Sequence, residues 1–198
     1  MFVSFEGVDG SGKSTQAQLL REWLEGLGRG VVACREPGGT ALGERIRDLL
    51  LAGAAMAPWA EAALFAAARA ELVAEVIRPA LARGEHVVCD RYVDSSLAYQ
   101  GVARGLGVER VLQLNLIATE ALLPDRTFLL LIDPVEARRR AGAEGDRIER
   151  EGSAFQHAVD RGYRDLADRF RERVVAVDAA RAPGAIASIV RGELRDLA

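Results

Sequence analysis

The chain has 198 residues, of which 49% are hydrophobic and 28% are charged. This composition excludes a disordered or low-complexity chain. The 26 basic and 29 acidic residues give a net charge of −3, so no basic field indicates binding to nucleic acid or to an anionic membrane. The two cysteines cannot form a disulfide framework. No apolar run is long enough to span a bilayer, and no leader-like segment follows Met1. We therefore expect one soluble cytoplasmic domain over residues 1–198, with neither nucleic acid nor a membrane as partner.

Short apolar segments alternate with longer amphipathic segments along the chain. The segments predicted as strands are residues 2–6, 31–35, 86–90, 127–132 and 173–177. The segments predicted as helices are residues 13–27, 40–51, 60–82, 108–122, 154–171 and 183–197, the fifth with Ser153 as its cap. Strands that are apolar throughout are typical of a parallel sheet covered on both faces, so the pattern predicts an α/β fold. Residues 138–152 are polar and glycine-rich, which indicates a mobile surface loop.

The sequence between the first predicted strand and the first predicted helix matches a phosphate-binding pattern. It reads Gly7-Val8-Asp9-Gly10-Ser11-Gly12-Lys13-Ser14, which fits G-x-x-x-x-G-K-[ST] without deviation. Glycines allow a tight loop whose backbone N–H groups face phosphate oxygens, and the helix N-terminus adds partial positive charge. Lys13 is expected to reach the β- and γ-phosphates, and Ser14 is expected to ligate Mg²⁺. We therefore expect a nucleoside triphosphate with magnesium to bind residues 7–14, together with Thr15 on the helix that follows.

Three classes of protein use such a loop: GTPase switches, ATPases that drive motion, and kinases of small molecules. A GTPase needs an N-K-x-D segment that reads guanine, and the only lysine of this chain, Lys13, is already in the loop. A motor or partitioning ATPase usually has more charged interaction surface or a second domain, for which 198 residues leave little room. A small-molecule kinase needs an acceptor site opposite the loop and a lid that excludes water. The sequence offers candidates for both.

Three groups of residues are candidates for the acceptor site. Residues 35–40 follow the second predicted strand, and Asp90-Arg91-Tyr92 follows the third. In open α/β sheets, ligands bind outside these carboxyl ends of strands. Phe65 and Arg69 are four residues apart on one face of a predicted helix, where a ring can stack on a base and a guanidinium can donate to an exocyclic oxygen. Each group taken singly has a plainer interpretation, which stays open. Residues 35–40 could be only a turn, Phe65 could be a core residue, and Arg69 could be a solvated charge on a helix.

Together these residues make the chain similar to the thymidylate kinases, a family of nucleoside monophosphate kinases, over residues 1–178. The segments that carry the resemblance are Phe5-Glu6-Gly7, Arg35 to Thr40 with Leu42-Gly43-Glu44, Leu64-Phe65 with Arg69, Asp90 to Tyr92 with Ser95 to Gly101, Asp133-Pro134, and Asp146-Arg147-Ile148-Glu149. The resemblance implies transfer of the γ-phosphate of ATP to dTMP with Mg²⁺. It also implies a P-loop kinase fold, with a five-stranded parallel sheet of order 2-3-1-4-5, and a homodimer.

The resemblance assigns residues to the phosphate end of the acceptor. Arg35 and Arg91 would grip the dTMP phosphate, a role that suits the forked guanidinium group. Glu36 and Pro37, which follow Arg35, would line the same ligand. Asp9 would contact the sugar 3′-hydroxyl or help to order the phosphates.

The resemblance also assigns residues to the base end of the acceptor. Phe65 would stack on thymine, and Arg69 would meet thymine O4. Ser96 and Gln100 would lie along the base. Tyr99 would crowd the 2′ position of the sugar and favour deoxyribose.

A lid is implied over about residues 138–152. Some thymidylate kinases carry a transition-state arginine in the phosphate loop, at the position of Gly10, whereas others supply it from the lid. Because glycine stands there, this chain resembles the lid type, and the candidate residues are Arg138, Arg139, Arg140 and Arg147. Which of them reaches the phosphates stays open.

A phosphate acceptor needs no general base, because its second pKa of about 6 leaves it mostly ionised at pH 7. Catalysis then rests on in-line positioning and on charge neutralisation by Lys13, Mg²⁺ and arginines. The resemblance implies that Asp90 acts near the magnesium through water. The runner-up is a deoxynucleoside kinase with Glu36 as the base for a sugar hydroxyl, against which the nearby arginines weigh. A nucleotide-binding module without catalysis is the third interpretation, and the intact Lys13-Ser14 pair argues against it.

Overall fold

The computed structural model describes residues 1–142, 146–148 and 150–195. Within these residues, five strands form one parallel sheet in the order β2-β3-β1-β4-β5, which confirms the predicted fold class. The strands are β1 (Phe2–Glu6), β2 (Val31–Arg35), β3 (His86–Asp90), β4 (Arg126–Leu131) and β5 (Val174–Asp178). The bounds of the first three agree with those predicted from the sequence, and the last two are displaced by one residue.

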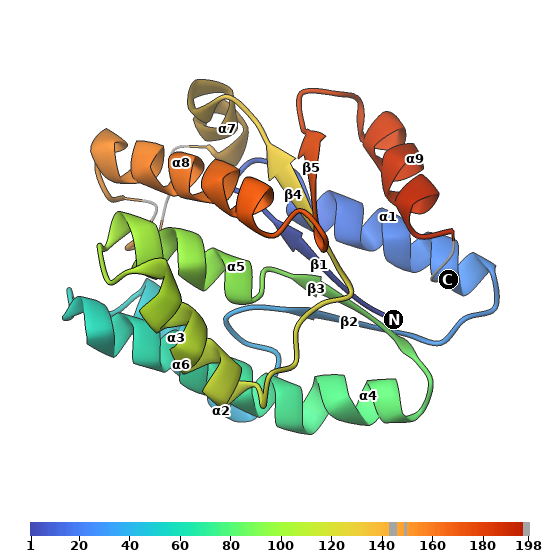
Figure 1. Cartoon of the computed structure of the whole chain (residues 1–198), viewed down its shortest axis with the longest axis horizontal. Coiled ribbons are helices and arrows are strands. Elements are labelled where there is room, and N and C mark those ends of the chain that lie inside the picture. The colour runs from blue at the N-terminus through green and yellow to red at the C-terminus, as the bar shows by residue number, and fades with distance from the viewer. Residues whose placement is uncertain (143–145, 149, 196–198) are drawn as a thin grey trace.

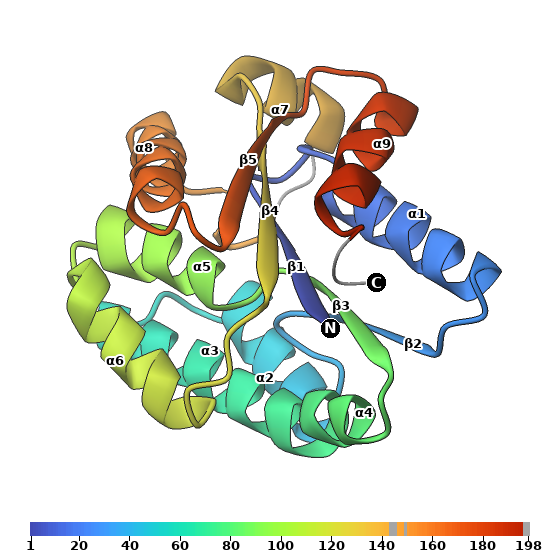
Figure 2. The same cartoon turned by 45° about the vertical axis from the view of Figure 1, so that its right-hand side comes forward.

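Helices cover both faces of the sheet, as predicted (Figure 1). On one face lie α1 (Lys13–Gly26) and α9 (Pro183–Glu193), which pack against each other. The other side of the sheet carries most of the remaining helices, among them α2 (Ala41–Leu51), α3 (Pro58–Leu72), α4 (Arg78–Ala82), α6 (Val108–Ala118) and α8 (Ser153–Arg169). In the turned view the sheet stands between these two sets of helices (Figure 2).

The central strands are buried on both faces, which explains why their sequences are apolar throughout. Successive side chains of β1 point to opposite faces. Val3 and Phe5 pack with Leu20 of α1 on one side, and Phe2 packs in the cluster that contains Leu72 of α3 on the other. The strand β2 lies at the edge of the sheet and is only partly buried.

The helix predicted over residues 60–82 is divided by a wider π-type turn, η1 (Val73–Ile77), between α3 and α4. In this turn the N–H of Arg78 donates to the carbonyl of Val73, five residues earlier. Pro79 lacks a backbone N–H, and its ring crowds the carbonyl four residues before it. A wider turn ahead of Pro79 relieves that crowding, which the apolar pattern of the sequence does not reveal.

Residues 93–103, to which no element was assigned, form α5 (Val93–Ser96) and a second π-type helix, η2 (Leu97–Ala103). Most of this segment is buried. Because there is little alternation of buried and exposed positions, the helical period that identifies an amphipathic helix is missing.

The prediction of a surface loop over residues 138–152 is wrong at its start, because residues 138–141 belong to the helix α7 (Pro134–Ala141). Asp133 caps this helix, since its Oδ1 accepts from the N–H groups of Val135 and Glu136 at 2.9 and 3.2 Å, and Pro134 opens it. Later in the predicted loop, Ile148 is only 6% exposed. That part of the segment is therefore packed against the protein, while residues 143–145 and 149 of the predicted lid lie outside the described residues.

Three smaller differences concern helix ends. Ser153 was expected to cap the helix of residues 154–171, but α8 begins at Ser153, and no side chain caps it. The helix α6 ends at Ala118, shortly before Glu120 turns the chain with a φ of 50°. The helix predicted over residues 183–197 ends at Glu193 as α9, before the described residues stop at residue 195. Among the helices that the structure does describe, none has both the length and the apolar character required to cross a membrane.

Candidate active site

The carboxyl ends of β1, β2 and β3 meet at one edge of the sheet. Asp90, the last residue of β3, is paired in register with Phe5 of β1 and with Arg35 of β2. A pocket of about 840 Å³ opens there, at the place where open α/β sheets bind ligands. The pocket brings together members of all three groups of residues that the sequence suggested for an acceptor, among them Arg35, Phe65 and Asp90.

The phosphate loop (residues 7–14) forms one side of this pocket, with Gly7 and Val8 behind the lining residues 9–16. Gly7 has a φ of 138°, and a Cβ there would lie 2.6 Å from the carbonyl oxygen of Leu130. Gly10 has a φ of 79°, and a Cβ there would lie 2.1 Å from the carbonyl oxygen of Ala137 in α7. Glycine is therefore needed at both positions, and α7 lies directly against the loop.

Lys13 is 6% exposed, and its Nζ donates to the carbonyl oxygen of Val8 at 2.9 Å, inside the loop. The Nζ also lies 3.6 Å from Oδ1 of Asp9. Burial and the nearby Arg91 lower the pKa of Lys13 to about 8, against the opposing effect of Asp9, Asp90 and Glu6. An anionic ligand in the loop would raise this pKa again, because it favours the charged form of the amine.

Arg91 joins the phosphate loop to the acceptor side of the pocket. Its Nη2 lies 2.6 Å from Oδ1 of Asp9, and its Nη1 donates to the Gly7 carbonyl and to the hydroxyls of Ser95 and Tyr163 at 3.0, 3.1 and 3.3 Å. Arg91 and Lys13 lower the pKa of Asp9 to about 2, although burial acts to raise it. Arg91 has a φ of 69°, a conformation that costs free energy and is held here by these contacts.

Ser14 and Asp90 place two oxygen atoms side by side at the mouth of the loop. The Ser14 hydroxyl donates to Oδ2 of Asp90 at 2.5 Å, and both residues line the pocket. Hydroxyl and carboxylate oxygens are the hard ligands that Mg²⁺ prefers. In the described part of the chain no group of three or more His, Cys, Asp or Glu residues gathers to hold a metal. A magnesium ion bound largely by phosphate and water, with few protein ligands, fits such a site.

The acceptor arm of the pocket is lined by Arg35, Glu36, Pro37, Phe65, Ser96, Tyr99 and Gln100. At its phosphate end, Nη2 of Arg35 lies 3.1 Å from both carboxylate oxygens of Glu44. Arg47, which the sequence analysis missed, also lines the pocket, and it donates to the Pro37 carbonyl at 2.8 Å. Burial and the neighbouring Arg35 lower the pKa of Arg47. Its position three residues after Glu44 on the same helix was the available signal.

At the base end, the ring of Phe65 is half-buried and borders the pocket. The guanidinium of Arg91 lies 5.5 Å from the centre of the Tyr99 ring. Within the described residues the buried hydroxyl of Tyr99 has no hydrogen-bond partner. A flat aromatic wall beside polar groups is suited to a planar, partly polar ligand such as a base.

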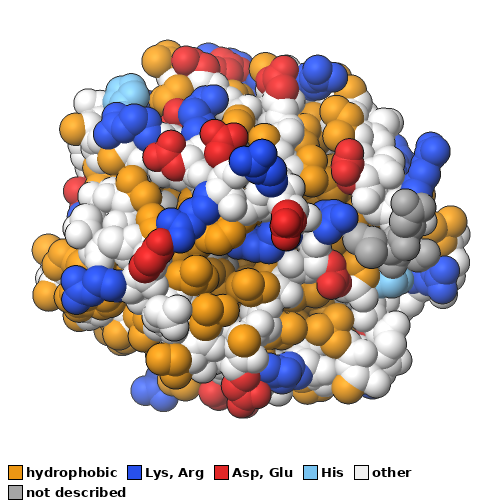
Figure 3. Space-filling model, in the orientation of Figure 1, with side chains coloured by type: hydrophobic (Ala, Val, Ile, Leu, Met, Phe, Trp, Pro, Cys, Tyr) orange, Lys and Arg blue, Asp and Glu red, His pale blue; other side chains and the backbone are white. Residues whose placement is uncertain are grey.

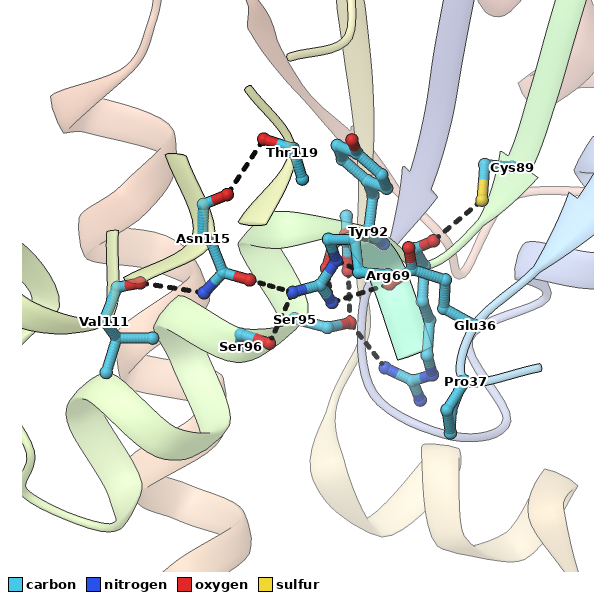
Figure 4. A network of polar contacts seen from close by, with 12 residues as sticks. Glu36, Pro37, Arg69, Cys89, Tyr92, Ser95, Ser96, Val111, Asn115 and Thr119 are labelled. Carbon is cyan, nitrogen blue, oxygen red and sulfur yellow. Dashed lines mark hydrogen bonds and ion pairs between the residues drawn. The ribbon is translucent and has the colours of Figure 1, made fainter. Parts of the chain in front are cut away.

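Arg69 does not line the pocket, although it was expected to contact a base. It is 1% exposed and lies behind the acceptor arm (Figure 4). Its Nε donates to Glu36 at 2.7 Å, and its two Nη atoms donate to Ser96 at 3.0 Å, to Asn115, and to the Tyr92 carbonyl at 3.0 Å. The guanidinium is thus fully engaged inside the protein. Burial raises the pKa of Glu36, against the opposing charge of Arg69.

The four lid arginines differ in position. Arg140 lines the pocket and donates to Glu136 and to the Ala179 carbonyl at 2.8 and 3.0 Å. Arg139 pairs with Glu136 at 2.7 Å, and its side chain is 72% exposed. Arg138 is exposed, and Arg147 is turned away from the pocket toward α2 and α3. Of the four, only Arg140 lies on the pocket wall in this conformation.

Comparison with known proteins identifies the family of the chain. The model of the thymidylate kinase family matches residues 5–188. The chain is 50% identical over 203 residues to a thymidylate kinase of Bifidobacterium longum (strain DJO10A), covering 100% of this chain and 98% of that protein. It is 54% identical over 184 residues to the thymidylate kinase of Symbiobacterium thermophilum, covering 91% of this chain and 86% of that protein.

A solved structure is similar as well. The crystal structure of thymidylate kinase from Ehrlichia chaffeensis superposes with a TM-score of 0.75 at 35% identity, covering 89% of this chain and 91% of that chain. The matches extend over nearly the whole sequence, and the structural match agrees with the fold. The chain therefore belongs to the thymidylate kinase family.

Proposed function

We propose that this protein transfers the γ-phosphate of ATP to dTMP, giving dTDP and ADP. The observation that carries the proposal is one continuous pocket that joins the phosphate loop to an arm with arginines at its near end and an aromatic ring at its far end. A nucleoside monophosphate has the same order of parts, with phosphate first and base last. Membership of the thymidylate kinase family supports thymine as that base.

The transfer needs no general base, because the acceptor phosphate is already mostly ionised at pH 7. The protein then has two tasks, which are to align the two phosphates and to neutralise the charge between them. Arg91 and Arg35 hold the acceptor phosphate. Lys13 holds the β- and γ-phosphates, and Arg140 reaches the transferred group from α7. Asp9 keeps Arg91 and Lys13 in place through its contacts with both.

Ser14 would hold the magnesium ion of bound ATP, with Asp90 near it through water. When bound, the metal supplies charge neutralisation at the β- and γ-phosphates. The close pair of oxygens formed by Ser14 and Asp90 supports this assignment.

The base lies against Phe65, with Ser96 and Gln100 along its edge. Tyr99 packs against the sugar at the 2′ position. Arg69 supports this end from behind, and it would reach thymine O4 only by exchanging one of its present partners.

The deoxynucleoside kinase interpretation needs Glu36 as a base, and the contacts of Glu36 weigh against it. One carboxylate oxygen of Glu36 lies 2.6 Å from Nη2 of the buried Arg69. The same oxygen also accepts from Nε of Arg69 at 2.7 Å. Arg35 and Arg91 line the same pocket, where they suit an acceptor that already carries a phosphate group. A module without catalysis is disfavoured by the intact phosphate loop and by family membership.

A coupled assay of ADP release tests the proposed function. With ATP and Mg²⁺ present, we expect rapid turnover with dTMP and little with thymidine, AMP or CMP. Glu36→Gln serves as the matched variant. Robust turnover of thymidine that disappears in Glu36→Gln would replace the proposal with the nucleoside kinase.

We also infer that the protein works as a homodimer of single-domain chains in the cytoplasm. Exposed large hydrophobic side chains gather on α2, α3 and α6, which pack side by side: Leu42, Leu49, Trp59 and Ile117. Apolar side chains are visible over this part of the surface in Figure 3. Both cysteines are free, which suits a reducing compartment. Light scattering after gel filtration is expected to give twice the chain mass for the native protein and a single chain mass for Ile117→Asp.

A further inference from the structure

Glu61, which no part of the mechanism above uses, is a carboxylate buried at the base end of the pocket. It lies in the first turn of α3 and is only 1% exposed. Its Oε1 accepts from the side-chain amide of Gln100 at 2.9 Å. Arg104 donates to both of its oxygens at 3.2 and 3.1 Å, and Arg147 donates to Oε2 at 2.7 Å. One carboxylate thus joins α3, η2 and the segment that follows α7.

These contacts fix the charge of Glu61. Burial acts to raise its pKa, but the hydrogen bonds from Arg104, Gln100 and Arg147 outweigh that effect and hold the pKa below its usual value. Glu61 is therefore ionised at neutral pH. An ionised carboxylate only accepts hydrogen bonds, so the amide of Gln100 must turn its NH₂ end toward Glu61.

This orientation matters because Gln100 lines the acceptor arm. With the nitrogen directed to Glu61, the amide oxygen is the group that Gln100 can offer to a ligand. Glu61 and Phe65 are four residues apart on one face of α3. The carboxylate that orients Gln100 and the ring assigned to stacking are therefore neighbours on the same helix.

We propose, on the basis of the dTMP kinase function, that Glu61 is a positioning residue that turns the Gln100 carbonyl toward the base and so selects pyrimidines with an N–H donor at N3. Thymine and uracil carry this donor. Cytosine has an unprotonated N3, which is an acceptor, so it faces the amide oxygen with no hydrogen between them. A buried polar group left unpaired in this way is a strong means of rejection.

The same carboxylate also holds the lid segment. Arg147 donates from Nε to the Leu50 carbonyl at 2.8 Å and from its backbone N–H to the Leu51 carbonyl at 3.0 Å. Arg104 has a second partner in Glu151, at 2.6 Å. Both arginines therefore keep other contacts when Glu61 is replaced, so a Glu61 variant is expected to fold.

The test compares kcat/KM for dTMP and dCMP in the native protein and in Glu61→Gln. A glutamine at position 61 can present either its oxygen or its nitrogen, so Gln100 becomes free to turn. We expect the preference for dTMP over dCMP to fall roughly tenfold or more, largely through a gain with dCMP. The preference for dTMP over dUMP is expected to stay unchanged, because both bases carry a donor at N3.

Two further variants separate this role from a structural one. Glu61→Asp keeps the negative charge for both arginines but withdraws the carboxylate from Gln100, so the dTMP preference should also fall. Asp94→Asn removes a carboxylate that is equally buried and pairs with Arg173 at 2.7 Å outside the pocket, and it should leave the preference unchanged. If Glu61→Gln does not fold, Glu61→Asp decides the question by the same ratio.

An unchanged preference in a folded Glu61 variant would overturn the inference, whatever happens to kcat, because a role limited to the lid lowers kcat for every acceptor alike. Failure of the native protein to phosphorylate dTMP would instead overturn the proposed function. In that case the ratio of the dissociation constants for dTMP and dCMP, measured by calorimetry, still tests Glu61 without catalysis.

Discussion

The phosphate loop and the acceptor arm line the same pocket, but different parts of the protein build them. The phosphate loop consists of consecutive residues, and its shape follows from glycines with positive φ and from the start of α1. The acceptor arm consists of side chains from β2, α3 and η2, held by buried pairs such as Arg69 with Glu36 and Gln100 with Glu61. A backbone site depends on local sequence, whereas a side-chain site depends on contacts between distant segments.

This difference predicts two kinds of mutational effect. Changes in the phosphate loop should reduce activity while the fold survives, because the loop lies at the edge of the sheet and the hydrophobic core is formed by other residues. Changes behind the acceptor arm should reduce stability, because they leave a buried charge without its partner.

The largest effect is expected for Lys13→Arg. The slim amine lies inside the loop, 2.9 Å from the Val8 carbonyl, where a planar guanidinium is too wide. We expect kcat to fall by about 10³-fold, with an unchanged circular dichroism spectrum and melting temperature. Retention of activity within a few-fold would mean that Lys13 acts only as a positive charge.

Behind the acceptor arm, Arg69→Met is expected to lower the free energy of unfolding by about 3–5 kcal/mol, because Glu36 is left as a buried charge without its partner. Chemical denaturation measures the change. The double variant Arg69→Met with Glu36→Gln should recover much of the loss, since neither charge then remains. A double variant no more stable than the single one would show that the pair is not coupled.

Among the lid arginines, Arg140→Ala is expected to lower kcat by about 10²-fold, with little change in dTMP binding. The matched control is Arg139→Ala, because Arg139 shares the partner Glu136 but points into solvent. Steady-state kinetics of the two variants decide the assignment. Equal effects, or a larger effect for Arg139, would require α7 to rearrange in the reacting complex.

The smallest effect concerns pH. In the free protein the pKa of Lys13 is about 8, and bound phosphates favour its charged form and raise that pKa. ATP binding should therefore take up a proton above pH 8, and affinity should weaken about tenfold between pH 7 and pH 9. Calorimetry in buffers of different ionisation enthalpy measures the uptake. In Lys13→Arg the uptake should vanish, because a guanidinium does not titrate in this range.

Much of the fold could be predicted because the strands are short, apolar and separated by clear helical patterns. The missed elements share a physical cause, which is that neither has one buried face and one exposed face. The segment η2 is buried almost all round, so it shows no helical period, and α7 has a single buried residue, Ala137, in eight. The Asp133-Pro134 start of α7 was a usable signal that the charged sequence after it obscured.

The site was predictable to different degrees in the two regions. The phosphate loop could be read from eight consecutive residues. In the acceptor arm the sequence identified Phe65, Tyr99 and Gln100, but it could not show that Arg69 lies behind the pocket. Which way a side chain turns depends on its partners, and those of Arg69 come from three segments that are distant in the sequence.

A crystal structure of the protein with dTMP and a non-hydrolysable ATP analogue tests the central claim most directly. We predict that the dTMP phosphate lies within hydrogen-bond distance of Arg35 and Arg91, that thymine stacks on Phe65, and that the γ-phosphate lies in line with the acceptor oxygen. The Gln100 carbonyl should face thymine N3. A complex in which the dTMP phosphate lies away from both arginines, or in which the base occupies another part of the pocket, would contradict the account.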